Sequence, residues 1–291
     1  MRTTMAALLL LPLVAYPVSG QSEATLKVFI SVDMEGITGL VNGEETSRTG
    51  KDYEYFRRIM TAETNAAIEG AAAAGAADIL VRDSHGSARN ILPDMLDQRA
   101  RLLRDWSGGP QGMMEGLDES FDAVVFIGYH AKAGTADAIL DHTWSGSVTD
   151  VSVNGVSLPE AGFNALIAGH YDVPVVFVAG DRAICEQAEA LFGTVETVAV
   201  KEGIGAAAIS LHPEIAQQMI RTGVERALRN IDDYRPYKMD APYTLVLKLK
   251  TDAAVYNGSF YPGATRTGDW ELTYTGGEVM DVVLAFSWMM R

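Results

Sequence analysis

The sequence predicts an α/β protein: a three-layer α/β/α core with a largely parallel sheet, an inserted β-hairpin and a small C-terminal α+β subdomain. Three observations support this class. Short apolar runs recur along the chain with helical segments between them. Residues 26–32, 53–74 and 79–81 read as strand, helix and strand, an order that makes a βαβ unit with parallel strands. An Asn154-Gly155 pair flanked by alternating residues marks a hairpin.

The elements that follow repeat the same pattern. Apolar runs predict strands at 123–128, 173–180 and 195–200, and amphipathic segments predict helices at 182–191 and 213–230. The alternating stretch 148–158 predicts the hairpin, which decorates the parallel core, and 159–169 predicts a helix. Strands at 244–249 and 270–274 and a closing helix at 278–289 make up the C-terminal subdomain.

We divide the chain into three segments on this basis. Residues 1–20 have the order of a secretory signal peptide: Arg2, an apolar run over 6–15, then small residues that include Val18 and Gly20. The run is short for a bilayer span, so a retained membrane anchor is the weaker interpretation. We therefore expect an exported protein, periplasmic or secreted, without membrane attachment after cleavage. Residues 25–232 form the metal-binding catalytic core, and 233–291 form the subdomain packed on it.

Charge and cysteine content restrict the partners and the redox chemistry. The formal net charge is -15, and removal of Arg2 with the signal peptide changes it to -16, which disfavours nucleic acid as a partner. Cys185 is the one cysteine in the sequence. An intramolecular disulfide is therefore impossible, and we interpret Cys185 as an unpaired core residue.

Metal-binding residue types follow three of the predicted strands. Asp33 and Glu35 end the first strand, and their spacing of two places both carboxylates on one side. His85 follows the second strand and His130 follows the strand at 123–128. Because ligands of open α/β sheets gather at the carboxyl ends of the strands, we expect these four side chains to converge on a metal.

Three further residues have open interpretations at this point. Glu160 is either a fifth ligand or a carboxylate that favours the positive end of the helix it opens. Asp83 either orients an imidazole or stabilises a turn. His142 lies in a loop and is either exposed or catalytic. Three carboxylates and two imidazoles would suit zinc better than magnesium or calcium, and one bridging carboxylate would allow two ions.

These motifs together resemble the D-aminopeptidase DppA family, peptidase family M55. The matching stretches are Ser31-Val32-Asp33-Met34-Glu35-Gly36, Asp83-Ser84-His85, Gly128-Tyr129-His130-Ala131 and Glu160-Ala161-Gly162-Phe163-Asn164-Ala165. The resemblance implies two Zn²⁺ per subunit, held by Asp33, Glu35, His85, His130 and Glu160, with Asp33 as the bridge. It implies a catalytic role for His142 and a ring-shaped homo-oligomer, a decamer in the family.

The resulting hypothesis is a dinuclear zinc aminopeptidase that removes the N-terminal residue of short peptides, with D-amino acids such as D-alanine as the expected substrates. Two alternatives remain open. Carboxylate and histidine clusters also bind metals for phosphoryl transfer, so a dinuclear phosphoesterase is possible, although no basic anion clamp accompanies the motifs. A non-catalytic metal- or peptide-binding protein of the same fold is the other.

Overall fold

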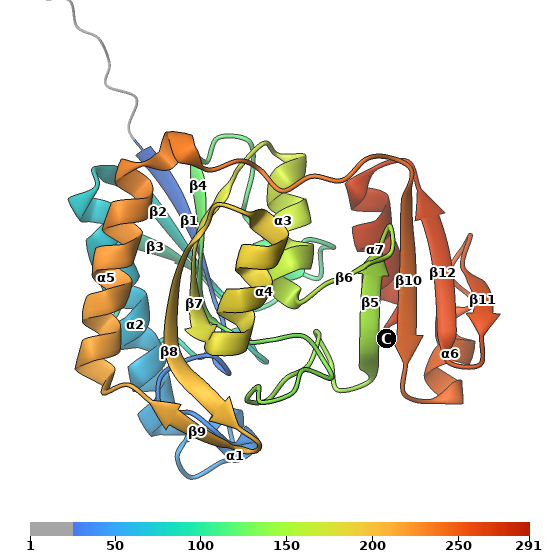
Figure 1. Ribbon diagram of the computed structural model, residues 1–291, viewed down its shortest axis with the longest axis horizontal. Helices are drawn as coiled ribbons and strands as arrows, with labels where there is room; N and C mark the ends of the chain where they lie inside the picture. The colour runs from blue at the N-terminus through green and yellow to red at the C-terminus, as the bar shows by residue number, and fades with distance from the viewer. Residues whose placement is uncertain (1–25) are drawn as a thin grey trace, which may run out of the picture.

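The computed structural model describes residues 26–291, which form two β-sheets with helices around them (Figure 1). The larger sheet has seven strands, and all neighbours in it run parallel except the last pair. Their order is β3 (Ala100–Leu103), β2 (Ala76–Asp83), β1 (Leu26–Val32), β4 (Ala123–Tyr129), β7 (Val175–Asp181), β8 (Glu196–Ile204) and β9 (Ala207–Ser210). The largely parallel sheet predicted from the sequence is confirmed.

Helices cover both faces of this sheet (Figure 1). Helices α2 (Tyr53–Ala73) and α5 (Pro213–Arg229) lie together on one face, and α3 (Glu160–His170) and α4 (Arg182–Phe192) lie on the other. The side chains of strand β1 show why both faces of the sheet are covered. Val28 and Ile30 pack into the cluster under α2 and α5, whereas Phe29 points the opposite way, into the cluster that contains Phe163 of α3. The α/β/α layering is therefore confirmed.

The predicted hairpin forms and belongs to a second sheet. Strands β5 (Val148–Val153) and β6 (Val156–Ser157) pair antiparallel, and Asn154 and Gly155 between them have φ values of 51° and 80°, as a two-residue hairpin turn requires. Strand β5 then pairs with β10 (Tyr243–Leu249). The inserted hairpin is therefore confirmed, and its partner strand is one that turn residues do not specify.

The second sheet has five strands in the order β11-β12-β10-β5-β6, with β11 at Thr265–Gly268 and β12 at Glu271–Gly276. Helix α7 (Val279–Met289) packs against β10 and β12 and against α3, so it joins the second sheet to the core. Both sides of the predicted boundary at residue 232 contribute to this sheet. The division of the chain into a core, residues 25–232, and a subdomain, residues 233–291, therefore stays a prediction.

The sequence missed the shortest elements, which carry too few apolar residues to show a period. They are β3, β9, β11, α1 (Gly43–Thr46), α6 (Asp252–Gly258) and two 3-10 turns, η1 (Gly112–Met114) and η2 (Ile231–Asp233).

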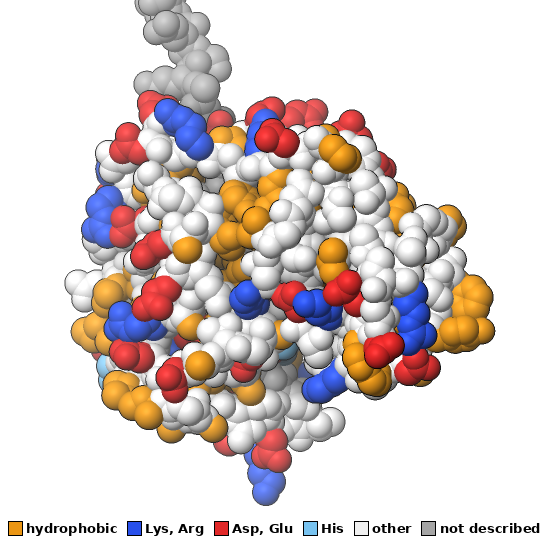
Figure 2. Space-filling view, turned by 45° about the vertical axis from the view of Figure 1, so that its right-hand side comes forward, with side chains coloured by type: hydrophobic (Ala, Val, Ile, Leu, Met, Phe, Trp, Pro, Cys, Tyr) orange, Lys and Arg blue, Asp and Glu red, His pale blue; other side chains and the backbone are white. Residues whose placement is uncertain are grey.

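Cys185 is buried and free, as expected. The predicted signal peptide lies outside the described residues. Within residues 26–291 no helix combines the length and the hydropathy that a membrane span needs. Acidic and basic side chains are interspersed with hydrophobic ones on the face in Figure 2.

Candidate metal centre

The predicted strand ends meet at one edge of the larger sheet. Strands β2, β1 and β4 are neighbours, so the residues that follow them, Asp33, His85 and His130, leave the sheet side by side. Two glycines allow the backbone segments at the ends of β1 and β4 to approach each other closely. A Cβ on Gly36 would lie 1.8 Å from the carbonyl oxygen of Tyr129, and one on Gly128, whose φ is +71°, would lie 2.2 Å from the carbonyl oxygen of Asp33.

A first group of three ligand-type side chains consists of Asp33, Glu35 and His85. The Nδ1 atom of His85 lies 2.9 Å from Oε2 of Glu35 and 3.3 Å from Oδ1 of Asp33. Both carboxylates are nearly inaccessible to solvent, with 3% and 6% of their surface exposed. The structure therefore brings together the three residues that the sequence placed at the ends of two neighbouring strands.

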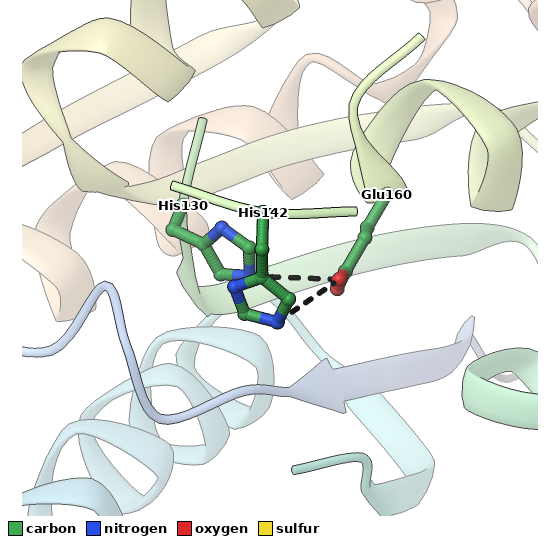
Figure 3. Close-up of side chains that lie close together, drawn as sticks. All are labelled: His130, His142 and Glu160. Carbon is green, nitrogen blue, oxygen red and sulfur yellow. Dashed lines mark ion pairs between the residues drawn. The ribbon is translucent and has the colours of Figure 1, made fainter. Parts of the chain in front are cut away.

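A second group consists of His130, His142 and Glu160, which come from the end of β4, just after the strand, from the loop before β5 and from the start of α3 (Figure 3). Each histidine has its Nε2 atom 3.6 Å from Oε1 of Glu160. The two imidazole rings stack with centroids 4.1 Å apart. His130 is buried, whereas the side chain of His142 is 28% exposed, so His142 is the histidine of this pair that solvent and a substrate can reach.

Asp33 connects the two groups. Its Oδ1 atom faces His85 of the first group, and its Oδ2 atom lies 3.4 Å from Nε2 of His130 in the second. A carboxylate whose two oxygens point to two different sets of ligands has the disposition of a bridging ligand. The family resemblance implied such a role for Asp33, and that role stays a prediction.

The histidines are oriented as metal ligands usually are. In each ring the nitrogen away from the carboxylates lies near a backbone carbonyl oxygen: Nε2 of His85 at 3.3 Å, Nδ1 of His130 at 3.0 Å and Nδ1 of His142 at 2.8 Å. A carbonyl oxygen only accepts hydrogen bonds, so in the neutral ring that nitrogen carries the proton and the opposite one presents a lone pair. All three lone pairs therefore point to the carboxylates.

Two buried atoms of the site lack a hydrogen-bond partner among residues 26–291, namely Oε2 of Glu35 and Nε2 of His130. Buried polar atoms of native proteins are rarely left without a partner. Both atoms face the centres of the two groups, where a cation would bind them. The donor set of carboxylate oxygens and imidazole nitrogens therefore fits a metal ion, and zinc in particular.

The electrostatics agree with this assignment. Burial lowers the pKa of His85 and His130, but the neighbouring carboxylates Glu35, Glu160 and Asp33 outweigh burial and raise both pKa values well above the ordinary value. Burial raises the pKa of Asp33, and the neighbouring imidazoles of His130 and His85 reverse this and hold the pKa below its usual range. The site thus creates a strongly negative potential that a cation would neutralise.

Asp83 has the second of the two roles left open above. Its carboxylate accepts hydrogen bonds from the backbone N–H groups of Asn90 and Ile91 at 2.6 and 2.7 Å and from the Asn90 amide at 2.8 Å. The same amide donates to the carbonyl oxygen of His85 at 2.7 Å. Asp83 therefore stabilises the turn that carries His85, without contacting the imidazole ring.

A buried lysine that sequence reasoning overlooked supports the loop of Glu35. The ammonium group of Lys201, on β8, donates to the carbonyl oxygens of Glu35 and Leu40. Glu63 of α2 accepts from the N–H of Thr38 in the same loop, at 2.9 Å. These contacts join segments far apart in the chain, and no local pattern in the sequence indicates them. Lys201 and Glu63 hold the backbone between the strand end and α1.

A cavity of about 160 Å³ opens onto both groups. Its lining includes Asp33, Glu35, His85, His142 and Glu160, and two indoles, Trp106 and Trp144, form part of the wall. Carboxylates and imidazoles that open into a cavity at the carboxyl edge of a parallel sheet are typical of metal-dependent hydrolases.

Comparisons with known proteins define the family. The family model of Peptidase_M55, described as D-aminopeptidase, matches residues 26–288. A D-aminopeptidase of Bacillus subtilis (strain 168) is 38% identical over 264 residues, which cover 89% of this chain and 95% of that protein. The solved structure of the "Zn-dependent D-aminopeptidase DppA from Bacillus subtilis, a self-compartmentalizing protease" has a TM-score of 0.87 and 32% identity, and the match covers 91% of this chain and 96% of that one.

The chain belongs to the D-aminopeptidase family, peptidase family M55. The resemblance inferred from the motifs is thereby confirmed, and so is the α/β fold class, since the two structures superpose over nearly their whole length. Membership places the protein in the class of metallo-aminopeptidases.

Proposed function

We propose that this protein is a dinuclear zinc aminopeptidase that removes the N-terminal residue of short peptides, with D-alanine-type peptides as substrates. The observation that carries the proposal is the position of Asp33, whose two oxygens face two separate groups of ligand-type side chains. The similar B. subtilis protein is described as a Zn-dependent D-aminopeptidase, which supports both the metal and the substrate class.

The ligand sets follow from the two groups. Asp33, Glu35 and His85 would hold one ion, and Asp33, His130 and Glu160 the other. When bound, zinc supplies Lewis acidity, which polarises a carbonyl and lowers the pKa of water toward about 7. The chain's own contribution is rigidity: backbone carbonyls fix the three imidazoles, and main-chain contacts at Gly36 and Gly128 fix the strand ends.

His142 is the residue that we propose to handle protons during peptide hydrolysis. Its Nδ1–H donates to the carbonyl oxygen of Leu140, which leaves Nε2 free to accept a proton. The ring lines the cavity and is the most exposed imidazole of the site. It can therefore take a proton from the attacking water and return it to the leaving amine, as a general base and then a general acid.

Two further proposals concern the assembly and the compartment. The similar B. subtilis enzyme is described as self-compartmentalizing, and we propose that this chain likewise forms a homo-oligomer, ring-shaped, whose active sites face an enclosed space. Size-exclusion chromatography with light scattering gives the subunit number. Export with cleavage after residue 20 is tested by N-terminal sequencing of the protein recovered from cell fractions.

The function is tested by hydrolysis of D-Ala-D-Ala, L-Ala-L-Ala and a phosphate monoester, before and after chelation and after restoring zinc. We expect zinc-dependent release of D-alanine, and two zinc ions per subunit by elemental analysis. Hydrolysis of the L-dipeptide in preference would refute the stereochemical assignment. Phosphatase activity alone would refute the peptidase assignment. No lysine or arginine is among the residues that line the cavity, so a phosphate ester would find no cationic side chain there.

His142 is tested by replacement with alanine. Loss of turnover with both zinc ions retained supports a proton-transfer role. Loss of one zinc ion together with activity would show that His142 is a ligand of the second group, which its distance from Glu160 also allows.

A further inference from the structure

A second cavity adjoins the metal site and is not needed to hold the metals. Its volume is about 270 Å³, larger than that of the cavity over the ligands. Trp106 and Trp144 line both cavities, so the two cavities share these residues as parts of their walls. The remaining walls of the second cavity come from α3, from α7 and from the loop 106–112, and they include Phe163, Ile167, Phe286 and Met290.

Trp144 connects this cavity with the second ligand group, because it lines the cavity and contacts Glu160. Its backbone N–H donates to Oε1 of Glu160 at 2.6 Å, and its ring meets the rings of Phe163 and Phe286 edge to face, each at 5.0 Å between centroids. The ring position is thus set by packing on α3 and α7. A side chain in the second cavity would lie against the residue whose backbone holds Glu160.

Trp106 ties the cavity to the first ligand group in a similar way. Its indole N–H donates to the carbonyl oxygen of Gly86, next to His85, at 2.8 Å. The guanidinium of Arg82, a fully buried side chain, lies 4.6 Å from the ring centroid and donates to the carbonyl oxygen of Asp105 at 2.6 Å. Both indoles are therefore held in place by contacts with the protein itself, which suits a preformed binding surface.

We propose, on the basis of the aminopeptidase function above, that this second cavity is a specificity pocket for a large apolar side chain next to the scissile bond. Burial of an apolar group against aromatic and aliphatic walls is energetically favourable. Arg291 is the one charged residue among those that line the cavity, and its guanidinium lies over Trp288, 4.6 Å from the ring centroid. Peptides with a phenylalanine-like residue, rather than alanine alone, are thus the substrates that fill the site.

The test uses a variant that fills the pocket without contacting the ligands. Ser287, a half-buried residue on α7, lines the pocket, so Ser287→Phe would occupy it. Leu284→Phe is the matched control, since Leu284 lies on the same helix, is 39% exposed and is not among the lining residues. Each protein, loaded with zinc, is assayed on D-Ala-Gly, D-Phe-Gly and D-Ala-D-Phe.

We expect the unmodified protein to cleave one phenylalanine dipeptide with a kcat/KM on the order of tenfold or more above that for D-Ala-Gly. The preferred dipeptide identifies which residue enters the pocket. Ser287→Phe should lose this preference, whereas Leu284→Phe should match the unmodified protein on all three dipeptides. Absence of the preference, or its persistence in Ser287→Phe, would overturn the proposal.

A binding measurement separates this proposal from the aminopeptidase assignment. Because two tryptophans line the pocket, titration with D-Phe-Gly and D-Ala-D-Phe should change the indole fluorescence saturably with at least one of them, and this change should be lost in Ser287→Phe. If no dipeptide is hydrolysed but the change occurs, the function fails and the pocket stands. If hydrolysis occurs without any such change, the pocket fails. Should Ser287→Phe not fold, Ser287→Leu takes its place in both assays.

Discussion

Replacing Glu63 with glutamine should stabilise the protein at alkaline pH. Glu63 lies on α2 beneath the loop of Glu35 and is fully buried. Burial raises the pKa of its carboxyl from 4.5 to about 7, although the N–H and hydroxyl groups of Thr38 and the charge of Lys201 act in the opposite direction. At pH 8 the Glu63 side chain is therefore a buried carboxylate, and its ionisation costs free energy in the folded state.

The size and sign of the effect follow from the two pKa values. Because the folded pKa lies above the unfolded one, the folded state binds more protons between pH 4.5 and 7, and stability falls as pH rises through this window. The loss is about 3 kcal/mol at pH 8 and about 1 kcal/mol at pH 5.5. Glutamine keeps the acceptor for Thr38, but its amide replaces an oxygen without a partner, which costs about 1 kcal/mol.

The expected net gain for Glu63→Gln is therefore about 2 kcal/mol at pH 8 and close to zero at pH 5.5. Urea unfolding at both pH values, at a fixed zinc concentration, measures it. Glu69→Gln is the control, because Glu69 is an exposed residue of the same helix, paired at 3.5 Å with Arg221, and should change stability by less than about 1 kcal/mol at either pH. A gain that is equal at the two pH values, or a loss at pH 8, would refute the reasoning.

Three more predictions concern the site itself. Asp33→Asn should lower the zinc content of both groups, whereas Glu35→Gln should lower that of the first group alone; elemental analysis of the two variants decides, and full retention in Asp33→Asn would exclude the bridge. Gly128→Ala should lower the melting temperature strongly or abolish folding, since its Cβ would lie 2.2 Å from a carbonyl oxygen, while Gly134→Ala, which has a similar φ of +80° but open space, should cost only about 1 to 2 kcal/mol by thermal unfolding. Asp83→Ala leaves two backbone N–H groups without their acceptor, so we expect a loss of about 2 to 5 kcal/mol in urea unfolding and weaker zinc binding in competition with a chelator; unchanged zinc affinity would show that the His85 turn does not depend on Asp83.

The strand ends were predictable because their geometry is regular. Once 26–32, 79–81 and 123–128 are taken as parallel neighbours, Asp33, His85 and His130 must emerge at the same edge. His142 was not predictable from the residues alone, because it lies in a loop where Leu140 and Trp144 adopt positive φ values of 55° and 60°, a path set by tertiary contacts.

Long-range contacts account for the other omissions. Lys201 reaches the carbonyl oxygens of Glu35 and Leu40 across more than 160 residues, and the apolar spacing around it indicates only a strand. The pairing of β5 with β10 could not be predicted from the sequence for the same reason. Local patterns specify which elements form, and the packing of distant segments decides what those elements touch.

The strand pairing between β5 and β10 also has a consequence for the order of assembly on the ribosome or after export. The backbone N–H of Asn154 donates to the carbonyl oxygen of Thr244 at 2.9 Å, and the N–H of Thr244 donates to the side-chain Oδ1 of Asn154 at 2.8 Å, across 90 residues of chain. The hairpin therefore has no long partner strand until the last part of the chain has emerged. Glu160 follows that hairpin directly and begins the helix on which α7 packs. An incomplete chain therefore lacks the support for one half of the metal centre, and hydrolytic capacity should appear only when synthesis is complete.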